Sequence, residues 1–271
     1  PITKPFWETG NQKLANTNAD AFKQGNWYAE AMQGIEKKEY EINYDAVAKS
    51  YTAPNRKNNL RSSFTASAFI MQPRNDSADK WKLKLNVKGI YADSKKIYTA
   101  DNHAHANQNG NTIQFNNNNN FVTEYVNTTE GVRQNFIINK APVQNTKQLS
   151  VKLTAGKNWF VNKVSSKEIH FAKATKIGYD KKITYNSLKV WDAGNKELDA
   201  CFNVVKNEIS ITVNTANAIY PITIDPISTT AATLLESNQA NSGFGWSVAS
   251  AGDVNGDGYS DVIVGANLYD N

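Results

Sequence analysis

Short segments in which apolar and polar residues alternate recur along most of this 271-residue chain. Residues 80–88 are a clear case, because lysines alternate there with one Trp, two Leu and one Val residue. A period of two places the lysines on one face of a β-strand and the apolar side chains on the other. Comparable segments span 39–44, 63–72, 81–91, 111–115, 121–127, 134–139, 149–153, 168–171, 183–191, 202–205, 208–213 and 219–224. Gly, Asn, Asp and Pro separate them, which predicts an all-β chain folded as an antiparallel β-sandwich.

Helical spacing is confined to one N-terminal segment. Residues 1–25 are polar and lack a clear period, so we expect them to form an extended lead-in. Asn26 is a suitable N-cap, and apolar residues recur at helical spacing from Trp27 as far as Lys38. The sequence therefore predicts one short helix, within a first region that spans residues 1–45.

A run of acidic and amide residues near the C-terminus has the spacing of a calcium loop. Asp253, Asn255, Asp257 and Asp261 occupy positions 1, 3, 5 and 9 of this loop. At that spacing their side-chain oxygens converge on one hard cation, and Tyr259 at position 7 adds its backbone carbonyl oxygen. We therefore expect these five residues to bind Ca²⁺.

The residues around this loop disfavour an EF-hand. Position 12 is Val264, where an EF-hand has a bidentate Glu. Residues 246–250 and 259–264 on the two sides have the composition of strands and not of helices. Gly258 at position 6 permits the sharp turn that the loop needs. The expected element is a calcium loop held between two strands.

A longer motif surrounds the loop, with Phe244-Gly245 before it and Gly265-Ala266-Asn267 after it. Together these residues resemble the FG-GAP repeat of integrin-α-type β-propellers, with Asn267 where the family has Pro. The resemblance covers about residues 229–271 and includes one repeat. In that family each repeat is one blade of about four strands, and several blades close a ring. The resemblance therefore implies a first, truncated propeller blade over residues 228–271.

An apolar run in this segment bears on its partners. Val262, Ile263 and Val264 follow one another without a polar residue, which is typical of a strand covered on both faces. A lone blade cannot bury its own apolar faces. We expect residues 229–271 to be ordered only where other propeller blades or a second protein chain cover them.

The middle of the chain carries a second resemblance, on five motifs that stand in order. They are Tyr51-Thr-Ala-Pro54-Asn55-Arg56, Leu60-Arg61-Ser-Ser-Phe64, Glu124-Tyr125-Val-Asn127, Gly131-Val-Arg-Gln134-Asn-Phe136 and Ala218-Ile-Tyr220-Pro221-Ile-Thr-Ile-Asp225-Pro226. They resemble the β-rich domain that precedes FG-GAP repeats in many bacterial secreted proteins. The resemblance spans about residues 27–227 and implies a sandwich domain over residues 46–227.

Two further interpretations depend on these motifs. Pro226 lacks a backbone donor, so we expect it to end the last strand and begin the linker to the propeller. Arg56, Arg61 and Glu124 are either site residues or members of a framework of strand-end ion pairs and turns, and the second interpretation is favoured.

Charge and composition narrow the classes of partner. The formal net charge is +5 and the pI is about 9.0, but the basic residues are scattered through strand-like segments and no nucleic-acid motif accompanies them. We therefore expect no nucleic-acid partner, and anionic glycans or a polyanionic cell surface suit the basic strand face better. The sequence contains no run of eighteen apolar residues, so it predicts no transmembrane segment. Cys201 is the only cysteine, so no disulfide forms within the chain.

Motifs for catalysis are absent from the sequence, which has no nucleophile elbow, phosphate-binding loop or zinc-protease helix. The first hypothesis is a secreted or cell-surface structural and adhesion protein with a calcium-stiffened propeller that binds proteins or glycans. The second is a secreted glycan-active enzyme or its carbohydrate-binding accessory module. The third is a subunit of an extracellular filament or surface assembly. A calcium loop suits the millimolar calcium outside cells, and a first residue that is Pro agrees with a processed chain.

Overall fold

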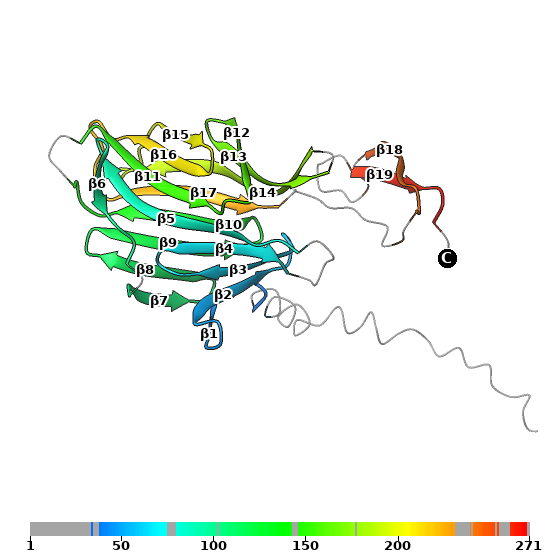
Figure 1. Ribbon diagram of the computed structural model, residues 1–271, viewed down its shortest axis with the longest axis horizontal. Helices are drawn as coiled ribbons and strands as arrows, with labels where there is room; N and C mark the ends of the chain where they lie inside the picture. The colour runs from blue at the N-terminus through cyan, green and yellow to red at the C-terminus, as the bar shows by residue number, and fades with distance from the viewer. Residues whose placement is uncertain are drawn as a thin grey trace, which may run out of the picture. The chain divides into compact units, whose positions relative to one another are not determined.

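The computed structural model describes residues 34, 38–74, 80–101, 103–142, 146–176, 178–230, 239, 241–252, 254 and 261–269. The chain divides into two compact units, Pro1–Thr230 and Ala231–Asn271. Apart from the helical residues 34 and 38, the regular structure in the described parts of both units is β-strand, so the predicted all-β class is confirmed (Figure 1). The predicted helix over residues 26–38 falls almost entirely outside the described residues.

Two antiparallel sheets make up the described part of the first unit, and we call them sheet A and sheet B. Sheet A has the order β1-β2-β3-β4-β5-β11-β16-β15, with β6 also paired to β5. Its strands are β1 (Asn43–Asp45), β2 (Ser50–Asn55), β3 (Leu60–Phe64), β4 (Ala68–Pro73), β5 (Leu83–Ala92), β6 (Lys95–Tyr98), β11 (Gln148–Ala155), β15 (Ala200–Val205) and β16 (Glu208–Asn214).

Sheet B has the order β12-β13-β14-β17-β10-β9-β8-β7. Its strands are β7 (His105–Asn109), β8 (Thr112–Asn118), β9 (Phe121–Thr128), β10 (Gly131–Ile138), β12 (Phe160–Ser165), β13 (Glu168–Thr175), β14 (Gly178–Trp191) and β17 (Ile222–Thr229). The second unit contributes a two-stranded sheet of β18 (Phe244–Gly252) and β19 (Asp261–Ala266).

The core lies between the inner faces of sheets A and B. Tyr125 from sheet B packs against two rings of sheet A, with centroid distances of 4.8 Å to Phe64 and 5.3 Å to Phe69. Tyr185 of sheet B and Phe202 of sheet A make a similar contact at 5.5 Å. These rings are buried, so face-to-face packing of the two sheets supplies the hydrophobic stabilisation that a sandwich requires.

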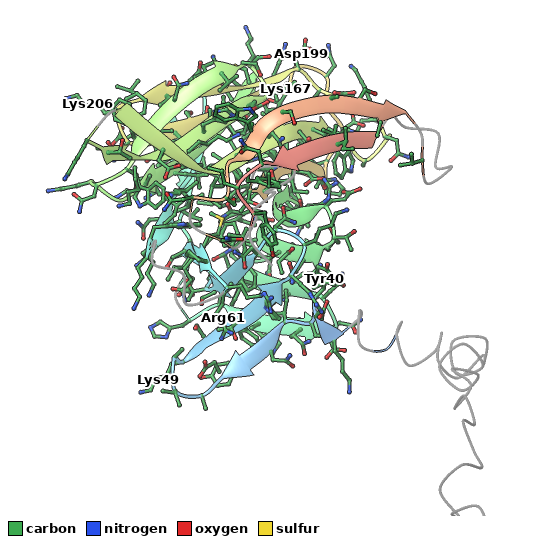
Figure 2. The ribbon with its side chains drawn as sticks, turned by 90° about the vertical axis from the view of Figure 1, so that its right-hand side faces the viewer. Tyr40, Lys49, Arg61, Lys167, Asp199 and Lys206 are labelled. Carbon is green, nitrogen blue, oxygen red and sulfur yellow. The ribbon has the colours of Figure 1, made fainter. Side chains whose placement is uncertain are left out.

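Alternation on β5 confirms the strand pattern read from the sequence. Leu83, Leu85 and Val87 are buried, whereas Lys84 and Lys88 are exposed. Tight turns connect neighbouring strands, and exposed lysines with a positive φ occupy two of them: Lys49 at 49° and Lys206 at 56°. Figure 2 shows both lysines at the outer ends of the unit, where a charged side chain stays in water.

Several predicted strand boundaries are wrong. Residues 63–72 form two strands and not one, because the Thr65 hydroxyl accepts the Ala68 N–H at 3.0 Å and closes a turn between them. Residues 116–118 lie outside the predicted strand 111–115, but β8 continues to Asn118 and only the next two residues make the turn. Strands β2, β6, β7 and β12 were not predicted as strands, because they are short or polar.

The prediction that Pro226 ends the last strand is also wrong. Strand β17 continues through Pro226 to Thr229 and lies between β14 and β10 in sheet B. The ladder with β14 is irregular between Asn186 and Lys189, opposite the segment that contains Pro226. A bulge of this kind accommodates a residue without a backbone N–H inside a sheet.

No helix among the described residues is long and apolar enough to cross a membrane.

Candidate functional site

The β18–β19 hairpin carries the loop that the sequence identifies as a calcium site. Its register pairs Val248 with Val264 and Gly252 with Asp261. Residues 253–260 therefore join two positions that lie opposite each other in the ladder. The strands thus hold the two ends of the loop together, which is the closure that a compact ion-binding loop needs.

The structure describes only one of the five predicted calcium ligands, and that one by its backbone alone. Asp253, Asn255, Asp257 and Tyr259 lie outside the described residues. Strand β19 begins at Asp261, so position 9 of the loop coincides with the start of a strand. Within the part of the chain that is described, no three His, Cys, Asp or Glu residues form a metal cluster.

The donor set nevertheless fits calcium by its chemistry. Carboxylate, amide and backbone carbonyl oxygens are the ligands that Ca²⁺ prefers, and the loop offers all three kinds. It contains no Cys or His that would favour zinc or copper. Calcium binding at these residues stays a prediction.

Two glycines of the second unit lie so close to a neighbouring side chain that a Cβ atom would collide with it. A Cβ atom at Gly265 would collide with the Ser247 hydroxyl across the ladder, and one at Gly243 would collide with the Asn267 side chain. Gly243 also has a φ of 64°, which favours glycine. A larger residue at Gly243 would therefore be strained and would displace the Asn267 side chain.

Apolar side chains on both faces of this hairpin are exposed within the described residues. Trp246 is 78 % exposed and Val248 62 % exposed on β18. Val262 and Ile263, which point to opposite faces of β19, are each 60 % exposed. The hairpin by itself thus leaves Val262 and Ile263 of the apolar run largely uncovered.

A lysine-rich groove on sheet A is a second candidate site. It has a volume of about 410 Å³ and is lined by Lys88 and Tyr91 of β5, Lys96 of β6 and Lys152 of β11, among others. The Lys152 ammonium lies 4.2 Å from the centroid of the Tyr91 ring. We call Lys88, Lys96 and Lys152 the lysine cluster.

The lysine cluster keeps its charge available to a ligand. None of its members forms a salt bridge with another described residue. Glu208 is the one carboxylate in the lining, beside the neutral polar groups of Asn203 and Ser210. Strand alternation predicted Lys88 on this face, but Lys96 and Lys152 were not foreseen because they come from other strands.

Three of the five motifs of the middle region lie on the neighbouring strands β9, β10 and β17 of sheet B, where their residues form a structural network. Gln134 on β10 donates to the Tyr125 hydroxyl at 3.2 Å and accepts from the Tyr185 hydroxyl at 2.9 Å. Arg133 forms a salt bridge with Asp225 on β17 at 2.8 Å. Burial raises the pKa of the Asp225 carboxyl above its ordinary value, and Arg133 offsets part of that rise.

The remaining motif residues also have structural partners. Glu124 accepts hydrogen bonds from Gln114 at 2.7 Å and from Asn135 at 2.8 Å. Arg56 pairs with Glu39 at 2.6 Å near the surface. These contacts agree with a framework of ion pairs and turns for Arg56 and Glu124, whereas Arg61 is exposed.

Comparison with known protein families gives one match, to a short C-terminal segment. Residues 244–271 match the FG-GAP repeat, a segment that includes both strands of the hairpin and the loop between them. The search of curated proteins found no match to the chain. The chain therefore contains an FG-GAP repeat at its C-terminal end, following two β-rich sheets.

Proposed function

We propose that this chain is a secreted or cell-surface structural and adhesion protein whose FG-GAP repeat is stiffened by calcium. The observation that carries the proposal is the register of the hairpin, which places Asp261 opposite Gly252 and so closes the acidic loop. Asp253, Asp257 and Asp261 would supply carboxylate oxygens to the ion, and Asn255 and Tyr259 neutral oxygens. Without the ion the three carboxylates repel one another, so calcium binding would hold the two strands in register.

Calorimetric titration of the intact chain with CaCl₂ tests the proposal. We expect saturable binding, and we expect Asp257→Ala to weaken it by at least about tenfold because one of three carboxylates is lost. Asp199→Ala is the matched control, since Asp199 is an exposed carboxylate of the sandwich. An absence of calcium binding, or equal binding by wild type and Asp257→Ala, would refute the calcium site.

We also propose that other propeller blades or a second protein chain cover residues 229–271. The exposed Trp246, Val248, Val262 and Ile263 support this, because each buried apolar side chain of this size contributes about 1.5–3 kcal/mol. A filament or surface assembly would supply the same cover through a neighbouring subunit. Sedimentation of the chain with and without Val262→Lys tests the second-chain form, and association that survives this substitution would contradict it.

A second candidate function, a carbohydrate-binding module, is favoured by the lysine cluster. Three ammonium groups around a groove with hydroxyl and amide donors suit a sulfated or carboxylated glycan. We expect the chain to bind dextran sulfate but not dextran at this groove, and Lys152→Gln to weaken that binding. Lys49→Gln, at an exposed turn of the same sheet, should leave it unchanged. An equal loss of dextran sulfate binding in the two variants would show that only the net charge matters, and it would rule out this candidate.

A further inference from the structure

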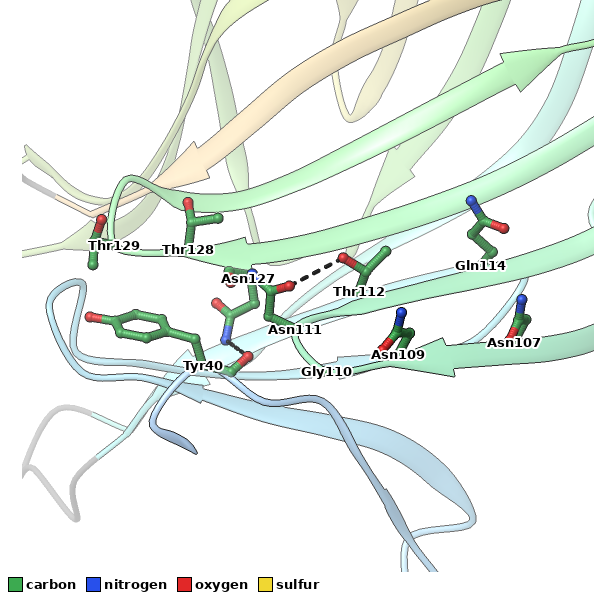
Figure 3. Close-up of a pocket in the computed structure, with 10 residues that line it drawn as sticks. All are labelled: Tyr40, Asn107, Asn109, Gly110, Asn111, Thr112, Gln114, Asn127, Thr128 and Thr129. Carbon is green, nitrogen blue, oxygen red and sulfur yellow. Dashed lines mark hydrogen bonds between the residues drawn. The ribbon is translucent and has the colours of Figure 1, made fainter. Parts of the chain in front are cut away.

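A pocket of about 730 Å³ opens beside the turn between β7 and β8, at one edge of the sandwich unit. Its lining is polar and contains no charged side chain. The lining residues are Tyr40, Asn107, Asn109, Gly110, Asn111, Thr112, Gln114, Asn127, Thr128 and Thr129 (Figure 3). We call this site the amide pocket.

The base of the amide pocket is rigid, because Asn127 is fully buried and uses its whole amide group. Its Nδ2 donates to the backbone carbonyls of Tyr40 at 3.0 Å and Pro54 at 2.7 Å. Its Oδ1 accepts from Asn55 at 2.7 Å, and its own backbone carbonyl accepts from Asn111 at 2.9 Å. A satisfied buried network of this kind fixes the positions of the groups around it.

One wall of the pocket is a grid of polar side chains on β7 and β8. Asn107 pairs with Gln114 across the ladder, and Asn109 pairs with Thr112. Residues two apart on a strand share a face, so all four side chains project from the same side of the hairpin. Figure 3 shows Asn107, Asn109 and Gln114 standing on that side.

Several of these groups are available to a ligand. Asn107 and Asn109 are exposed, and neither side chain makes a hydrogen bond to another described residue. The Tyr40 ring stands at the opposite end of the pocket from Asn107 in Figure 3. The pocket thus combines free amide donors and acceptors with one aromatic ring.

We propose that the amide pocket binds a neutral saccharide. A sugar hydroxyl both donates and accepts hydrogen bonds, and so do the free carboxamides of Asn107 and Asn109. Gln114 already donates to Glu124, which leaves its carbonyl oxygen as an acceptor. The lining has no charged side chain whose attraction would offset the cost of desolvating an ionic ligand. The face of the Tyr40 ring would pack against the C–H groups of a sugar ring. A peptide that extended the sheet at β7 would instead use backbone groups and would not depend on the amide side chains.

The site does not involve the calcium loop or the lysine cluster, so its test is independent of both. The probes are neutral tetrasaccharides of glucose, mannose and galactose, with binding to the full chain followed by saturation-transfer NMR and calorimetry. We expect at least one of them to bind saturably, and Tyr40→Ala and Asn109→Ala each to weaken it by about tenfold or more, as for loss of a central contact. Tyr40→Phe should retain most of the binding because it keeps the ring.

Asn162→Ala is the matched control, since Asn162 is an exposed amide on β12, at the opposite edge of sheet B from β7. It should bind the saccharide as wild type does, and unchanged thermal melting should show that each variant is folded. No saturable binding by any tetrasaccharide would overturn the proposal. So would binding that Tyr40→Ala and Asn109→Ala leave unchanged, and so would a preference for an extended peptide that both variants retain.

Discussion

At the scale of single residues, Asp225 combines a buried carboxylate with an incomplete set of partners. Arg133 pairs with its Oδ2 atom at 2.8 Å, while its Oδ1 atom has no hydrogen-bond partner in the described structure. Burial of the carboxyl is the main cause of its raised pKa. The folded chain therefore holds this proton more tightly than the unfolded chain does.

This difference predicts a specific dependence of stability on pH. Because the folded pKa lies above the ordinary value of 3.8, ionisation of Asp225 costs stability as the pH rises through the window above 3.8. Asp225→Asn removes that ionisation. We expect the free energy of unfolding of wild type, relative to Asp225→Asn, to fall between about pH 4 and the raised pKa. Urea unfolding of both proteins at a series of pH values measures this, and a pH-independent difference would contradict it.

At the scale of elements, the bulge in β5 shapes the lysine groove. Gly89 has a φ of 131°, and the ladder between β5 and β11 shifts register at Lys152 and Leu153. A Cβ atom at Gly89 would collide with the Tyr98 carbonyl and with the stem of Lys96. The absence of a side chain at Gly89 therefore lets Lys96 lie across β5 and join the groove.

Gly89→Ala should be destabilising for both reasons. We expect a loss of about 1–3 kcal/mol in the free energy of unfolding, from an unfavourable φ and a backbone collision. Gly156→Ala is the control, because its φ is not positive and an added Cβ would make only an ordinary contact with Trp159 at 3.7 Å. Chemical denaturation of the two variants checks the prediction, and equal stability would show that β5 relaxes around the new side chain.

At the scale of the whole molecule, the division at Thr230 separates the sandwich from the repeat-containing unit. Strand β17 closes the sandwich between β14 and β10, and Thr230 after it donates to the Asn58 carbonyl at 3.1 Å. The buried network at Asn55, Asn58 and Asn127 lies in the same unit. The sandwich therefore contains its own core and its own polar network.

A fragment that ends at Thr230 should keep the stability of the sandwich. We expect its thermal midpoint to lie within about 3 °C of the sandwich transition in the full chain, since it keeps every strand of sheets A and B. A fragment that ends at Ile224 should melt much lower, because it loses the second half of β17 in the middle of sheet B. Scanning calorimetry compares them, and a large destabilisation of the longer fragment would show that residues after Thr230 complete the sandwich.

Local patterns in the sequence determined the all-β class, the lysine face of β5 and the spacing of the calcium loop. Each depends on residues a few positions apart, such as the buried Leu83 and the exposed Lys84, or Asp253 and Asn255 within one loop. Propensity and period act over that distance, so a single sequence carries the information. The calcium site itself stays a prediction on those grounds.

Only the tertiary structure decided where the distant segments meet. Asn55 and Asn127 join across the sandwich, and the lysine cluster draws its members from three strands. Pro226 lies inside a central strand because the β14–β17 ladder has a bulge opposite it, and a residue without a backbone N–H fits at a bulge. Register and strand order arise from cross-strand packing between residues far apart in the chain, and no local period records that packing.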